Sequence, residues 1–208
     1  GFIKFDLLGL ATLKMMEVCI QHILRRHHGI EAPTFAQVRD YYNEKLHPDV
    51  INLEDQEVYE NIFHAGKWAG VFQFTESGAQ GFCTRVKPRN IIDVSAITSI
   101  FRPGPLSAGV DTDYVEAKNH PHYIKYLSDE AREITEETFG FLIFQEQIAL
   151  LAHKLGGLTL DEGNMLRKVL TKKGTGKNSV KGKLHDKFIT GCVSQGIDRD
   201  EAQTLWDK

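Results

Sequence analysis

The chain has 208 residues, with 25 Lys and Arg against 28 Asp and Glu, and a formal net charge of −3. Its 41% hydrophobic and 25% charged residues exclude a collagen, a chain that is disordered throughout and a disulfide-stapled miniprotein. No apolar run approaches the ~18 residues that a transmembrane helix needs, so no membrane partner is expected. Three widely spaced cysteines favour a reducing, cytoplasmic location. Because the chain opens on Gly1 within an apolar run, we expect it to be a piece of a longer protein.

Residues 1–7 are the only good strand candidate, and most of the remaining chain has helical spacing of its apolar residues. Helices are expected over 10–26, 35–46, 54–65, 76–86, 90–101, 111–119, 144–155, 160–171, 183–195 and from 199 onward. Residues 69–74 fit either a short strand or a turn, and 120–138 are of mixed type. The sequence therefore predicts a mainly α chain with a short β segment at its start.

The first candidate site lies in that β segment. Strand alternation places Lys4 and Asp6 on one face. A carboxylate among apolar neighbours is costly unless it is paired or bound to a metal. Asp6 is therefore either a salt-bridged or capping residue at a strand end or a metal ligand.

The second candidate is Arg102, which precedes Pro103-Gly104-Pro105. Proline cannot continue a helix, so this segment is at least a helix-ending turn. A stiff loop that presents one cation also suits anion recognition, because little entropy is lost on binding.

The third candidate is a basic segment, residues 167–187. It holds eight Lys or Arg and one acid, a net charge of +7, which leaves −10 on the rest of the chain. On a helix, Arg167 and Lys168 lie within about one turn of Lys172, and Lys173 follows. Clustered cations suit polyphosphates and nucleic-acid backbones, although a solvated charged face or a loop remains an alternative. The Gly-Thr-Gly-Lys stretch at 174–177 lacks the spacing of a phosphate-binding loop.

Five short motifs follow one another along the chain. They are Lys4-Phe5-Asp6-Leu7-Leu8-Gly9-Leu10, Gly70-Val71-Phe72-Gln73, Arg102-Pro103-Gly104-Pro105-Leu106, Phe144-Gln145-Glu146-Gln147, and Leu166-Arg167-Lys168 with Lys172-Lys173. Together they resemble the bacterial replicative DNA polymerase III alpha subunit, the C family of DNA polymerases. Lys168 stands where the family usually has a second arginine, and residues 174–183 depart from the family pattern.

The resemblance implies that residues 1–30 end a polymerase-beta-like nucleotidyltransferase palm and that residues 31–208 are part of the helical fingers. It makes Asp6 the third catalytic aspartate and a ligand of two Mg²⁺ ions, shared with an upstream pair of aspartates absent from this chain. The same resemblance assigns nucleotide or DNA contacts to Lys4, Arg102, Arg167, Lys168, Lys172 and Lys173.

The implied function is that of a DNA-directed DNA polymerase, which transfers deoxynucleotides to a primer 3′-OH by a two-metal mechanism in chromosomal or phage replication. Its partners would be template-primer DNA, deoxynucleoside triphosphates and, through regions outside this chain, a sliding clamp and other replisome subunits. One aspartate cannot hold two metals, so this piece alone is expected to be inactive. The alternatives are a non-catalytic helical module that binds nucleic acid through residues 167–187, and a protein-interaction scaffold without nucleotide chemistry.

Overall fold

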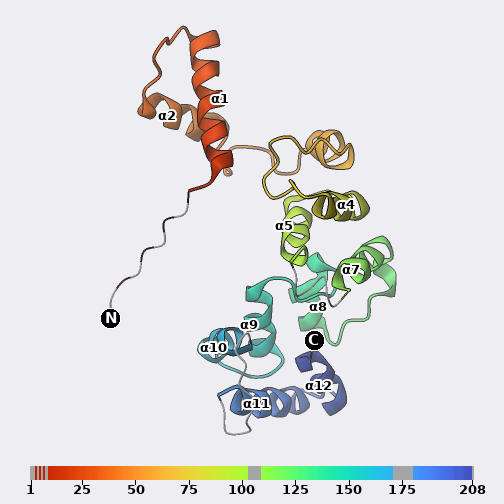
Figure 1. Cartoon of the computed structure of the whole chain (residues 1–208). Helices are drawn as coiled ribbons and strands as arrows, with labels where there is room; N and C mark the ends of the chain where they lie inside the picture. The colour runs from red at the N-terminus through yellow and green to blue at the C-terminus, as the bar shows by residue number, and fades with distance from the viewer. Residues whose placement is uncertain are drawn as a thin grey trace. The chain divides into compact units, whose positions relative to one another are not determined.

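The computed structural model describes residues 3, 5, 7, 9–102, 109–170 and 180–207. These described residues form helices and turns and no strand, which confirms the mainly α class (Figure 1). The α-helices are α1 (Ala11–His28), α2 (Phe35–Lys45), α3 (Gln56–Val58), α4 (Ser77–Val86), α5 (Ile91–Ile100), α7 (Val110–Asn119), α8 (Asp129–Thr135), α9 (Gln145–Lys154), α10 (Leu160–Leu170), α11 (Val180–Ser194) and α12 (Arg199–Asp207). A π-helical turn covers Tyr59–His64, and 3₁₀ turns cover Pro121–Tyr123 and Glu136–Thr138.

The β segment expected at residues 1–7 falls largely outside the described residues. Ile3, Phe5 and Leu7 are described and have no regular secondary structure, while the other four positions are not described. The division into a palm part over 1–30 and a fingers part over 31–208 therefore stays a prediction.

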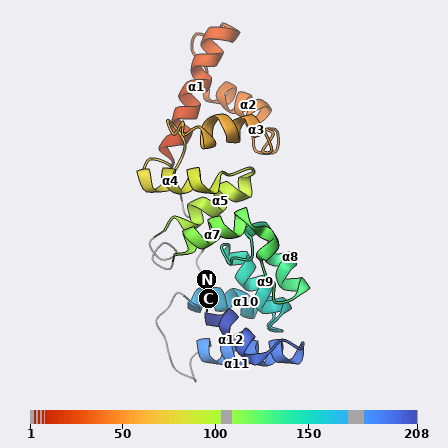
Figure 2. The ribbon, with the colours of Figure 1, turned by 90° about the vertical axis from the view of Figure 1, so that its right-hand side faces the viewer.

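The chain folds as two compact units, Gly1–Ile91 and Ile92–Lys208. In the first unit, α1 and α2 lie side by side and bury Ile20, Leu24 and Val38 between them (Figure 2). The sequence fixes the start of α2 locally. Thr34 and Gln37 form a capping box, in which each side chain accepts a hydrogen bond from the other residue's backbone N–H.

Residues 69–74 of the first unit form a turn, which resolves the alternative that the sequence left open. The Val71 N–H donates to the Trp68 carbonyl at 3.0 Å, and the Phe74 N–H donates to the Val71 carbonyl at 3.3 Å. Gln73 adopts a left-handed backbone with φ 66°. The buried Phe74 ring stacks on Trp68 at 5.5 Å between centroids and anchors this turn.

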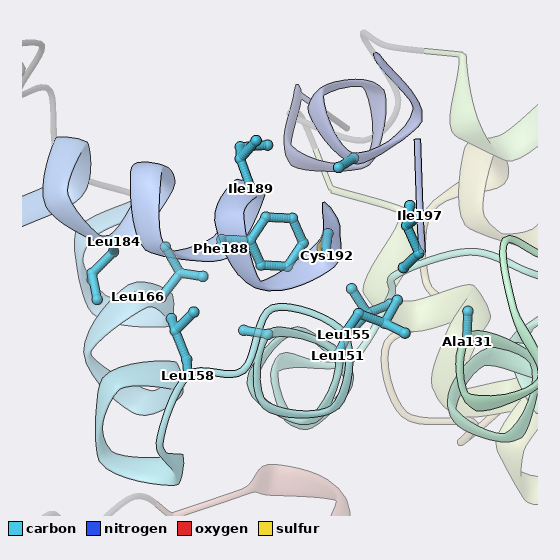
Figure 3. Packing of buried hydrophobic residues seen from close by; sticks show 12 residues of the cluster. Ala131, Leu151, Leu155, Leu158, Leu166, Leu184, Phe188, Ile189, Cys192 and Ile197 are labelled. Carbon is cyan, nitrogen blue, oxygen red and sulfur yellow. The ribbon is translucent and has the colours of Figure 1, made fainter. Parts of the chain in front are cut away.

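The second unit is organised around an apolar core from α8 to α12. Its buried members are Ala131, Leu151, Ala152, Leu155, Leu158, Leu166, Leu184, Phe188, Ile189, Cys192, Ile197 and Ala202. Figure 3 shows Phe188 of α11 between Leu158 and Leu166 on one side and Leu151 and Leu155 on the other. Burial raises the pKa of the Cys192 thiol to about 11, so this residue acts as a small apolar core side chain.

Helix α11 approaches the turn after α9 through glycine. A Cβ on Gly191 would lie 1.9 Å from the Gly156 carbonyl oxygen, and a Cβ on Gly156 would lie 2.2 Å from the Phe188 ring. The backbones can meet only because both residues lack a side chain. This contact fixes α11 against the α9–α10 pair.

Candidate functional site

Helices α9 and α10 form an antiparallel pair held at close range by Gly163. A Cβ at Gly163 would lie 2.8 Å from the carbonyl oxygen of Ala149. Four residues after Gly163 stands Arg167, and four residues before Ala149 stands Gln145. One helical turn from the close approach, these two side chains therefore face each other.

Arg167 and Lys168 stand in the last turn of α10, where cations interact favourably with the helix dipole. The preceding residue, Leu166, points into the core and is 3% exposed. Lys168 is exposed, whereas Arg167 is half-buried. The structure thus brings two of the predicted phosphate-binding residues together at one end of α10.

The guanidinium of Arg167 is held by a residue of α9. Its Nη1 donates a hydrogen bond to Oε1 of Gln145. Its Nε is buried and has no hydrogen-bond partner among the residues that the structure describes. Because that partner is a neutral amide, the contact fixes the guanidinium without pairing its positive charge with a negative one.

Gln147 fixes the start of α9. Its side-chain oxygen accepts hydrogen bonds from the backbone N–H groups of Ile143 and Phe144, each at 2.9 Å. Its side-chain nitrogen donates to the Ile134 carbonyl at 3.1 Å and to Thr138 Oγ1 at 2.8 Å. A 4%-exposed glutamine is thereby fully satisfied, and it ties α9 to the segment before it.

Sequence reasoning missed both glutamines as site residues, although they lie in the Phe144–Gln147 motif. The signal was a pair of polar residues at alternate positions of a helix start. Spacing alone did not show that one of them is buried and that the other reaches Arg167.

The structure gives fewer contacts for the remaining predicted site residues. Arg102 is exposed and follows α5, and its backbone N–H donates to the Ile100 carbonyl at 2.7 Å. The loop that follows it lies outside the described residues. So do Lys4, Asp6, Lys172 and Lys173.

Part of the basic segment serves the fold. Lys187 of α11 lies 2.7 Å from both carboxylate oxygens of Glu162 on α10. The Lys187 ammonium and the Thr159 backbone N–H hold the pKa of the Glu162 carboxyl below its ordinary value. The +7 counted over 167–187 is therefore partly neutralised by an acid outside that segment.

No cluster of three or more His, Cys, Asp or Glu side chains that could hold a metal occurs within the described ranges. Asp6, the predicted Mg²⁺ ligand, lies outside the described ranges. A hollow of ≈ 490 Å³ lies beside Gly156 and Gly157 and is bounded by α11 from Asp186 to Ser194. None of the predicted site residues lines it.

Comparison with known proteins agrees with the motifs. The family of the bacterial DNA polymerase III alpha subunit finger domain matches residues 16–196. The chain belongs to this family. The fingers expected from the sequence are thereby confirmed, and α9, α10 and their glutamine–arginine contact all lie within the matched range.

Individual relatives are similar along nearly the whole chain. DNA polymerase III subunit alpha from Treponema pallidum is 32% identical over 208 residues, and the protein of that name from Campylobacter jejuni is 31% identical over 205. The one from Aquifex aeolicus is 30% identical over 207 residues. The chain spans about 16% of the length of each of these three relatives. None of the described helices is long and apolar enough to cross a membrane.

Proposed function

We propose that this chain is the fingers region, with the end of the palm, of a cytoplasmic DNA-directed DNA polymerase that extends a primer on a DNA template. The observation that carries the proposal is Arg167, held by Gln145 next to Lys168 at the end of α10, in a chain of the finger-domain family. A preorganised guanidinium with an adjacent ammonium suits a triphosphate, whose negative charge must be balanced during phosphoryl transfer.

Each candidate residue then has a role on the substrate. Arg167 and Lys168, with Lys172 and Lys173, bind the triphosphate of the incoming deoxynucleotide. Arg102 contacts the nucleotide or the template-primer junction, and Lys4 approaches a phosphate. Such contacts position the substrate without reading sequence, so the base is selected by pairing with the template.

Two Mg²⁺ ions would activate the primer 3′-OH and stabilise the leaving pyrophosphate. Within this chain, Asp6 is the one proposed ligand of these ions, because its motif resembles that of the polymerase family. Further aspartates must come from outside the chain, as must the contacts to a sliding clamp and other replisome subunits. The 208-residue chain alone is therefore expected to be inactive.

The test is Asp6→Asn in the full-length polymerase that carries these residues. Nucleotide incorporation, measured by primer extension, should be abolished, while fluorescence anisotropy should show unchanged binding of template-primer DNA. Asp161→Asn, at an exposed carboxylate in the first turn of α10, is the matched control and should retain activity. Retained incorporation by Asp6→Asn would contradict the assigned metal role. If the unsubstituted protein and Asp161→Asn both bind DNA but incorporate no nucleotide, the result favours a non-catalytic nucleic-acid-binding module.

A further inference from the structure

The contact between Gln145 and Arg167 differs from an ordinary surface ion pair. A guanidinium has five N–H donors, and Gln145 accepts from one of them at Nη1. The amide carries no charge, so the contact restricts the guanidinium without neutralising it. A carboxylate in the same place would compete with an anionic ligand for the cation.

The acceptor itself stands on a rigid base. Gln145 is the first residue of α9, and the four hydrogen bonds of Gln147 fix that helix start. On the other side, the contact of Gly163 with the Ala149 backbone sets the separation of α9 and α10. Both ends of the Gln145–Arg167 hydrogen bond are therefore placed by buried structure, although Gln145 is itself exposed.

The Gln145–Arg167 contact lies outside the apolar core. Gln145 is exposed and is not a member of the α8–α12 cluster, and its partner is a half-buried charged side chain. Its physical consequence is instead the orientation of the guanidinium. Ordering a long side chain before a ligand arrives removes an entropic cost from binding.

We propose that Gln145 is a positioning residue, whose side-chain oxygen holds the Arg167 guanidinium in the orientation that receives the triphosphate. This inference rests on the proposed function, because it takes Arg167 as a phosphate contact. The role acts through Arg167 and requires no substrate contact by Gln145 itself.

The experiment is a double-mutant cycle in the full-length polymerase, with KM and kcat measured for the incoming deoxynucleoside triphosphate. Gln145→Met removes the acceptor and keeps the side-chain length. We expect it to raise KM roughly tenfold, the scale of one hydrogen bond to a charged group, and to change kcat little. In an Arg167→Ala background, the same substitution should have no further effect.

Glu146→Met is the matched control, since it introduces the same side chain at the neighbouring exposed position of α9. It should leave KM within about twofold of the unsubstituted enzyme. If Gln145→Met does not fold, as judged by thermal unfolding, Gln145→Ala replaces it in the cycle.

The outcomes distinguish the triphosphate contact of Arg167 from the positioning role of Gln145. If Arg167→Ala leaves KM unchanged, the proposed triphosphate contact fails. If Arg167→Ala raises KM but Gln145→Met does not, only the positioning role is overturned. An effect of Gln145→Met that persists without Arg167, or that Glu146→Met reproduces, would also overturn that role.

Discussion

The two ends of α10 each hold a cation, and they hold it differently. In the first turn, Glu162 binds Lys187 of α11 with both carboxylate oxygens at 2.7 Å. In the last turn, Arg167 is bound by the neutral amide of Gln145 on α9. The first contact pairs a positive charge with a negative one, whereas the second fixes a positive charge without pairing it with a carboxylate among the described residues.

This difference separates a cation that serves the fold from one that is available to an anion. Lys187 links α10 to α11, and its charge is balanced within the protein. Arg167 is also held by a neighbouring helix, but its partner there is a neutral amide, so that contact does not balance its charge. Counting Lys and Arg over residues 167–187 treats the two alike, which is why the net charge of that segment overstates what it offers to a phosphate.

The largest expected effect on stability comes from a substitution that pushes α9 and α10 apart. Gly163→Val places a branched side chain against the Ala149 backbone, where even a Cβ would lie 2.8 Å from the carbonyl oxygen. We expect the free energy of unfolding to fall by about 2 kcal/mol through overpacking. Urea unfolding followed by tryptophan fluorescence measures it, since Trp206 packs against this core.

Asn164→Ala, at the adjacent exposed position of α10, is the control for Gly163→Val and should change the stability by less than about 0.5 kcal/mol. If the valine variant is as stable as this control, the helices are not held together by the close approach at Gly163.

A smaller effect concerns the ion pair at the first turn. Because the folded-state pKa of Glu162 is below its ordinary 4.5, its stabilisation is present above that pH and is lost as the pH falls through the folded pKa. Glu162→Gln should therefore lower the midpoint of thermal unfolding slightly at pH 7. The difference should vanish in strong acid, where the unsubstituted carboxyl is also protonated.

Thermal unfolding between pH 2 and pH 7 tests this expectation. A difference between Glu162→Gln and the unsubstituted chain that grows as the pH falls would show that Lys187 does not stabilise the carboxylate.

Local features of the fold could be predicted from the sequence. The spacing of apolar residues predicted most helices. Capping residues precede two of them: Thr34 accepts a hydrogen bond from the Gln37 N–H before α2, and Asp198 accepts from the N–H groups of Asp200 and Glu201 before α12. These signals depend on residues within one or two turns of each other. Residues 69–74 could not be decided in this way, because the turn is held by the stacking of Phe74 on Trp68.

The candidate site was predicted only in part. Arg167 and Lys168 were identified by charge and motif, but their separate environments were not. Gln145 lies 22 residues from Arg167, and Glu162 lies 25 residues from Lys187, so each contact depends on how helices pack. Helix periodicity shows which face of a helix is apolar. It does not show which polar residue of a neighbouring helix will contact a given polar side chain.

The most direct test of the account compares the two cations in the full-length polymerase, by the KM for the incoming deoxynucleoside triphosphate. Arg167→Ala should raise KM about 30-fold, since a charge-assisted contact to phosphate is lost. Lys187→Ala should leave KM within about twofold, because its charge is balanced by Glu162. An unchanged KM in Arg167→Ala, or an equal rise in both variants, would contradict the claim that, of these two cations, Arg167 binds the substrate and Lys187 does not.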